Sequence, residues 1–134
     1  MSKRETRIFG KLVQVVQRIR REAEQALADG PVDPSRFFIL SLLARTGPLP
    51  QVAIAEHMGS TPANVSQLLR RLEADGYVER PARRRTRPVH LTALGAALVD
   101  ELAPRHASFL AAQMGRLSGE ELEVFEALLD RLEP

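Results

Sequence analysis

The sequence predicts a mainly α-helical chain of the α+β class, with six helices and one short β-hairpin. Three observations lead to this fold class. Apolar residues recur at steps of three and four through most of the chain, which is the spacing of one helix face. Glycines and prolines divide the chain into segments of helical length. Two short segments alternate apolar and polar side chains on either side of an arginine-rich stretch, as hairpin strands do.

The first two helices are expected at residues 6–28 and 36–46. Apolar side chains at helical spacing mark the first of them, and Gly30 with two prolines ends it. Ser35 has the side chain of an N-cap and is expected to begin the second helix, which closes at Gly47. Because the second helix is apolar nearly all round, we expect it at the centre of the fold.

Two shorter helices are expected at residues 50–58 and 62–75. Pro50 is expected in the first turn of the earlier one, where its missing N–H costs nothing. A tight turn with Gly59 leads to Thr61, a good N-cap for the later one. The later helix has one apolar stripe, formed by Val65, Leu68, Leu69 and Leu72.

The hairpin is expected from the strand-like segments 77–80 and 87–92. Its strands must be short, because Pro81 and Pro88 are tolerated only at strand ends or edges. The arginine-rich stretch then forms the connection between the two strands.

Two helices are expected to complete the chain. Thr92 caps the first, residues 93–115, in which Pro104 should cause a bend or a break. Ser118 and Glu121 form a capping box for the last helix. The apolar stripe of that helix consists of Leu122, Phe125, Leu128, Leu129 and Leu132.

The outer three helices carry more apolar surface than a central unit of about 60 residues can cover. They therefore need each other and a second copy of the chain, which predicts a homodimer with a helical dimerisation region at residues 1–34 and 93–134. The candidate dimerisation residues are Ile8, Leu12, Val16, Leu122, Phe125, Leu129 and Leu132.

Charge is unevenly distributed along the chain, although its net value is only +2. Residues 35–92 contain nine arginines and four acidic residues, whereas residues 93–134 contain three arginines and eight acidic residues. A positive centre beside an acidic flank indicates that the middle of the chain meets a polyanion.

Helices 50–58 and 62–75, joined by a tight turn, have helix-turn-helix spacing. With its apolar stripe on the core, the second offers Gln67 for adenine and Arg70 for guanine. An ordinary amphipathic helix is the alternative, but the preceding helix, the cap and the basic hairpin favour a DNA-recognition helix. Its candidate contacts to bases and phosphates are Thr61, Ala63, Asn64, Ser66, Gln67, Arg70 and Arg71.

Residues 80–88, RPARRRTRP, place five arginines between three prolines. A solvated loop or a localisation-type tag are the alternatives, but a tag usually lies at a terminus or in a linker. Because this stretch directly follows the expected recognition helix, its arginines are expected on phosphates or in a minor groove. The candidate wing contacts are Arg80, Arg83, Arg84, Arg85 and Arg87.

The stretches GPLPQVAIAEHMGSTPANVSQLLRRLEADGYVER and VHLTALG resemble the winged helix-turn-helix core of the MarR (multiple antibiotic resistance regulator) family of bacterial transcription regulators. The flanking helices are similar to the dimerisation helices of that family. The resemblance implies a homodimer in which residues 35–92 form the winged helix-turn-helix DNA-binding domain. It also implies that helix 62–75 enters the major groove and that residues 80–88 are the wing.

The sequence departs from the pattern of this family in three ways. An acidic residue that helps to brace the wing is usual where this chain has Arg83, followed by Arg84 and Arg85. The wing is a few residues shorter than usual. Pro50 stands where a Ser or Thr cap is common.

Other classes of function find little support in the residues. The chain has no cysteine, which excludes disulfides and thiolate zinc sites, and its three histidines lack metal-ligand spacing. No nucleophile with a base, glycine-rich phosphate loop or pair of carboxylates indicates an enzyme or a cofactor. No segment approaches the ~20 apolar residues of a membrane helix, and the composition is compatible with the cytoplasm. The aromatic residues Phe37, Phe38 and Phe109 are expected in the core rather than in a ligand pocket.

The favoured hypothesis is a homodimeric, sequence-specific repressor that binds double-stranded DNA. Its two-fold axis demands a pseudo-palindromic operator with half-sites about 10 bp apart or a multiple of that. The resemblance implies a small aromatic or amphipathic effector between the dimer helices and the winged domain, which favours a spacing of recognition helices that misfits DNA. A winged-helix module for protein contact and a non-specific nucleic-acid-binding module remain as alternatives.

Overall fold

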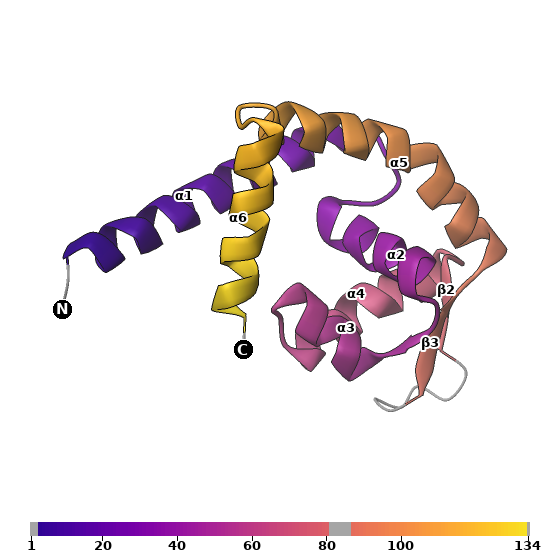
Figure 1. Cartoon of the computed structure of the whole chain (residues 1–134). Helices are drawn as coiled ribbons and strands as arrows, with labels where there is room; N and C mark the ends of the chain where they lie inside the picture. Colours follow the sequence, from indigo (N-terminus) through magenta and orange to yellow (C-terminus); the bar gives the residue numbers. More distant parts are fainter. Residues whose placement is uncertain (1–2, 81–86, 134) are drawn as a thin grey trace.

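The structure, a computed structural model, describes residues 3–80 and 87–133. This part of the chain forms six helices and three short strands (Figure 1). The mainly helical α+β prediction is therefore confirmed. The elements in order are α1 (Lys3–Ala26), α2 (Pro34–Thr46), β1 (Leu49–Pro50), α3 (Gln51–Met58), α4 (Pro62–Ala74), β2 (Val78–Glu79), β3 (Pro88–Leu91), α5 (Ala93–Met114) and α6 (Gly119–Leu132).

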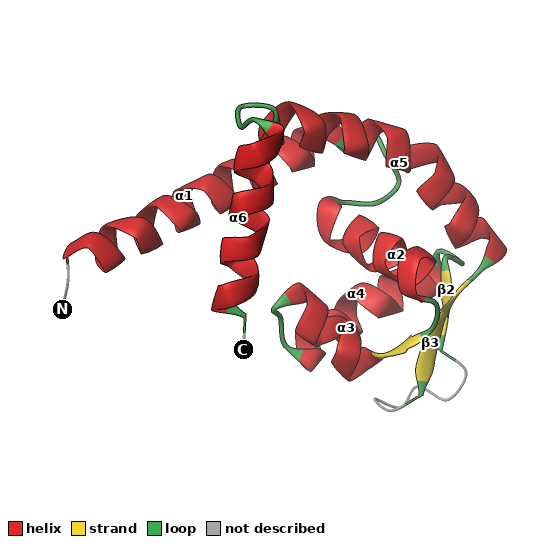
Figure 2. Ribbon diagram, in the orientation of Figure 1, coloured by secondary structure: helices red, strands yellow, loops and turns green. Residues whose placement is uncertain are grey.

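The hairpin belongs to a three-stranded antiparallel sheet in which β3 lies between β1 and β2. Val78 of β2 is opposite Leu91 of β3, and Leu49 of β1 is opposite Val89 on the other side of β3. Figure 2 shows this small sheet beside α2 and α4. The hairpin prediction is confirmed, whereas β1 was missed because two residues are too few to show an alternating pattern.

The buried core lies between α2, α3, α4, the sheet and the first half of α5. Helix α2 is buried on most of its surface, which confirms its predicted central place. Helix α4 directs Val65, Leu69 and Leu72 inward. The core residues are Leu27, Val32, Phe37, Ile39, Leu40, Leu42, Leu43, Ile54, Ala55, Val65, Leu69, Leu72, Val78, Val89, Leu98 and Leu102.

Helices α1 and α6 leave their apolar side chains uncovered within one chain. Figure 1 shows α1 extending as an arm from the rest of the molecule and α6 descending from the end of α5. Phe9 on α1 is 68% exposed and Leu132 on α6 is 75% exposed, and α6 contains no buried residue at all. Among the described residues, the first half of α1 is exposed and α6 buries no side chain, whereas the second half of α1 contacts α5 and buries Ala23.

Helix α5 runs through Pro104 without a break, and Figure 1 shows it curving over α2. A proline inside a helix removes one backbone hydrogen bond, which permits curvature. The buried side chains of Leu98 and Leu102 hold the preceding turns against the core. Of the two expected outcomes, the bend is the one observed.

The starts of two helices and one core residue differ from the sequence-based expectations. Asp33, not Ser35, is the N-cap of α2, because its carboxylate accepts the N–H of Arg36 at 2.9 Å and Pro34 occupies the first helical position. Pro50 lies before α3 with an extended backbone, since it belongs to β1. Phe38 is 41% exposed rather than buried, on a face of α2 that the described chain does not cover.

Candidate nucleic-acid interface

Helix α4 begins with the cap that its sequence predicts. The hydroxyl of Thr61 accepts the N–H of Asn64 at 3.2 Å, and Pro62 occupies the first helical position. The side-chain amide of Asn64 in turn donates to the hydroxyl of Ser60 at 2.8 Å. Both interactions fix the end of α4 that a recognition helix directs toward the base edges.

The turn between α3 and α4 is fixed from two sides. Gly59 has φ 62°, a left-handed conformation that glycine adopts without strain, and its N–H donates to the last turn of α3. The buried side-chain amide of Gln51 donates to the carbonyl oxygen of Pro62 at 2.8 Å, which ties the start of α3 to the start of α4. Sequence reasoning missed Gln51, although a glutamine that begins an otherwise apolar helix is a usable signal.

The polar side chains predicted to contact bases lie on one face of α4, opposite its buried stripe. Ser66 is half-buried at the edge of this face. None of the ion pairs among the described residues involves Arg70 or Arg71, so both guanidinium groups are available to an external anion. The exposed members of the face are Thr61, Ala63, Asn64, Gln67, Arg70 and Arg71. Their contact with DNA stays a prediction.

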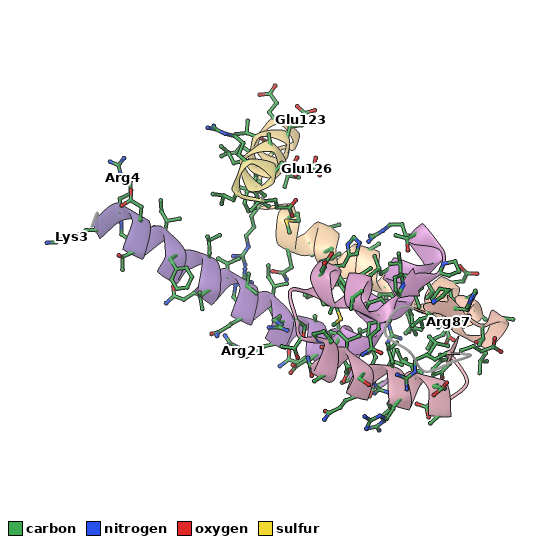
Figure 3. All side chains as sticks on the ribbon, turned by 90° about the horizontal axis from the view of Figure 1, so that it is seen from below. Lys3, Arg4, Arg21, Arg87, Glu123 and Glu126 are labelled. Carbon is green, nitrogen blue, oxygen red and sulfur yellow. The ribbon has the colours of Figure 1, made fainter. Side chains whose placement is uncertain are left out.

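The predicted wing residues have different surroundings. Arg87 is exposed just before β3, and Figure 3 shows it well apart from the acidic Glu123 and Glu126 of α6. The side chain of Arg80 is only 8% exposed, and its guanidinium lies 3.4 Å from a carboxylate oxygen of Glu73 on α4. The predictions for Arg83, Arg84 and Arg85 fall on residues outside the described parts of the chain.

The far end of α4 is attached to two other helices. Arg36 of α2 is buried and lies 3.7 Å from the carboxylate of Asp75, the C-cap of α4. The hydroxyl of Thr92 donates to the carbonyl oxygen of Gly76 at 2.6 Å and also caps α5. Gly95 in the first turn of α5 packs so closely on Tyr77 that a Cβ would collide with the carbonyl oxygen of Tyr77. Sequence reasoning missed the Arg36 contact.

The described residues contain no group of three side chains that could hold a metal ion. None of the described helices has the length and apolar character that crossing a bilayer requires. The chemistry available at this surface is therefore that of exposed amides, hydroxyls and guanidinium groups on a fixed helix.

Comparison with known proteins identifies the family. Residues 32–85 match the MarR family. The chain is 32% identical to the transcriptional regulator HosA of Escherichia coli O111:H- over 127 residues, which cover 92% of this chain and 93% of HosA.

Two solved structures show the same fold. One is a MarR family protein of Mycobacterium tuberculosis in complex with DNA, with 28% identity, a TM-score of 0.71, and coverage of 92% of this chain and 94% of that one. The other is BpsR of Bordetella bronchiseptica, whose DNA binding is regulated by 6-hydroxynicotinic acid. It has 25% identity, a TM-score of 0.85, and coverage of 96% of this chain and 99% of that one. The winged helix-turn-helix fold of this chain and its likeness to HosA over nearly the whole length place it in the MarR family of DNA-binding transcription regulators.

Proposed function

We propose that this protein is a homodimeric, effector-responsive repressor that binds a pseudo-palindromic operator in the cytoplasm. The observation that carries the proposal is the exposed polar face of α4, whose two ends are both fixed by caps and side-chain contacts. A recognition helix that is held before DNA arrives loses little conformational freedom on binding.

The face of α4 offers groups for both base and phosphate recognition. Gln67 and Arg70 are suited to the edges of adenine and guanine in the major groove. Ala63 permits close approach at the start of the helix. The remaining polar groups, on Thr61, Asn64, Ser66 and Arg71, are suited to phosphates or neighbouring bases. Arg87, together with Arg83, Arg84 and Arg85, supplies the positive charge for the flanking backbone or minor groove.

The uncovered faces of α1 and α6 support a dimer. An apolar surface of this extent on two helices needs a second chain to exclude water. The two helices are also complementary in charge, since α1 begins with Lys3, Arg4 and Arg7 whereas α6 carries Glu120, Glu123 and Glu126 (Figure 3). We therefore propose that α1 and α6 of two chains pack together through Ile8, Leu12, Val16, Leu122, Phe125, Leu129 and Leu132. The two recognition helices then face successive turns of the major groove.

The effector is proposed to be a small aromatic acid, by analogy with the regulation of BpsR by 6-hydroxynicotinic acid. An open hollow of about 510 Å³ lies between the end of α1 and the start of α2. Its wall carries Arg20 and Arg21, which can bind a carboxylate, beside the acidic Glu24 and Asp33. Such a ligand represses DNA binding only if it binds the misfitting dimer more tightly than the fitting one.

Selection of bound sites from a random duplex library tests the proposal directly. We expect two inverted half-sites about 10 bp apart, or a multiple of that, and an affinity at ~150 mM salt at least about 1,000-fold above that for random duplex. Equal affinity for random duplex would favour the non-specific alternative. No binding to any duplex would favour a module for protein contact.

Arg70→Ala refines the test at the level of one side chain. We expect a loss of about 1–3 kcal/mol that is confined to particular base pairs of the selected site. Arg116→Ala is the matched control, because it removes the same charge from an exposed position beyond α5. If Arg70→Ala weakened binding to all sequences equally, the base-contact role would be wrong.

A further inference from the structure

Arg80, at the base of the wing, does not have the surroundings of a phosphate contact. Its side chain is 8% exposed, and its Nε is buried without a hydrogen-bond partner among the described residues. Arg70, Arg71 and Arg87 are all exposed. A guanidinium that neutralises a phosphate needs access to the surface, and among these arginines Arg80 lacks that access.

The partner of Arg80 lies on the recognition helix itself. One of its terminal guanidinium nitrogens lies 3.4 Å from Glu73, whose side chain is 26% exposed in the last full turn of α4. The pair therefore connects α4 directly to the residue that follows β2. The buried guanidinium depends strongly on this pair, because without Glu73 its charge is left uncompensated.

The backbone between these two residues is held by the turn after α4, by the core and by the sheet, since Val78 is buried and lies opposite Leu91 of β3. The N–H of Tyr77 donates to the carbonyl oxygen of Leu72 at 2.9 Å, and Gly76 makes the turn with φ 85°. These contacts hold β2 as far as Glu79, which lies opposite His90 of β3. The Glu73–Arg80 contact adds a direct attachment to α4 at the residue where β2 ends.

We propose that Arg80 is a positioning residue that does not contact DNA but, through Glu73, fixes the angle between the recognition helix and the wing. This inference rests on the proposed DNA-binding function. It assigns the wing arginines two roles: Arg80 orients the wing, and Arg87 with its neighbours meets the phosphates.

The two roles for Arg80 predict opposite behaviour in a double-mutant cycle. As a brace, Arg80→Met removes the attachment to α4, and Glu73→Gln leaves a buried cation without a counter-charge. In the double variant no buried cation remains, so the two losses are not additive. As a phosphate contact, Arg80→Met would weaken binding whether Glu73 is present or not.

The experiment measures operator affinity against salt for the wild type, Glu73→Gln, Arg80→Met and the double variant, in the full-length chain. We expect each single change to weaken binding, and the double variant to bind at least about threefold more tightly than the two losses combined would allow. The dependence of log affinity on log salt should stay as in the wild type. Arg87→Met is the matched control, for which the slope falls by about one unit without coupling to Glu73.

A second pair of measurements separates a brace from a merely structural contact. The exchanged pair Glu73→Arg with Arg80→Glu should recover affinity relative to either exchange alone, in samples whose circular dichroism shows them folded. Additive losses, or a salt slope lowered by about one unit in Arg80→Met, would overturn the brace.

The proposed function and the brace fail in distinguishable ways. A wild-type chain that selects no operator would overturn the proposed function. The same cycle read by thermal unfolding still tests the pair, and additive shifts of the melting temperature would overturn the brace on its own.

Discussion

In the winged unit, residues 35–92, Leu69 and Leu72 of α4 are buried, whereas Leu129 and Leu132, at the same helical spacing on α6, are exposed. Both helices have an N-cap of the expected type and one apolar stripe. The difference is that α4 packs against α2, while α6 makes no comparable contact with another element of the described chain. Periodicity thus predicts that a helix has an apolar face, but only the fold decides which chain covers it.

The largest expected effect is a difference between the two regions in how their stability depends on protein concentration. Leu69→Ala should lower the free energy of unfolding by about 2–5 kcal/mol at every protein concentration, because it leaves a cavity inside one chain. Leu132→Ala, on the exposed face of α6, should act only where dimers form. Thermal unfolding over a hundredfold range of concentration checks both. A loss for Leu132→Ala that did not change with concentration would contradict the comparison.

The next effect concerns dimerisation and DNA binding together. Leu129→Asp places a charge in the proposed interface and should give monomers in analytical ultracentrifugation. Operator affinity should fall by about 100-fold or more, because two linked recognition helices gain a high effective concentration that single ones lack. Ala127→Asp introduces the same charge on the opposite side of α6 and should leave both properties unchanged. A dimeric Leu129→Asp protein would exclude this face as the interface.

The junction between the two regions is tested at Gly95. An added Cβ would meet the backbone of Tyr77, so Gly95→Ala should cost about 1–3 kcal/mol of stability. Gly119→Ala is the control at the start of α6, where nothing lies within 4 Å of the added atom. It should be neutral or stabilising by up to about 1 kcal/mol. Denaturant titration measures both, and equal effects would show that the junction tolerates movement.

The smallest effect is a pH dependence at the border between the winged unit and the outer part of α5. His106 packs edge-on against Phe37, with ring centroids 4.9 Å apart, and burial lowers its pKa from the usual 6.5. The unfolded chain therefore binds more protons than the folded one just below pH 6.5, and stability falls as the pH drops. His106→Leu should lack this component when melting temperatures at pH 7.5 and 5.5 are compared with the wild type. If His106→Leu showed the same change in melting temperature between pH 7.5 and 5.5 as the wild type, the role of His106 would be contradicted.

Local signals in the sequence account for most of the fold. Thr61, Thr92 and Ser118 with Glu121 all form the predicted caps, because a cap depends only on residues three positions away. Helix α1 begins and ends two to three residues before its predicted bounds. Such ends depend on fraying and on the following turn rather than on the apolar pattern.

Contacts between distant residues could not be predicted in the same way. Gln51 reaches a carbonyl eleven residues away, and Arg36 reaches the C-cap of α4 from another helix. The exposure of Phe38 follows from which side of α2 the neighbouring helices leave open. The arginine-rich composition of the wing gave no sign that Arg80 would be buried against Glu73.

The close packing of Gly95 on Tyr77 couples the orientation of α5 to that of α4. Because the start of this helix is attached to the turn that ends α4, we expect a rotation of α5 to carry the recognition helix with it. Its 22 residues span about 33 Å at 1.5 Å per residue. A tilt of about 5° over that length shifts one end by about 3 Å, close to the ~3.4 Å rise of one base pair. If an effector of the proposed kind turned α5 by a few degrees, that shift would be enough to move the two recognition helices out of register with their half-sites.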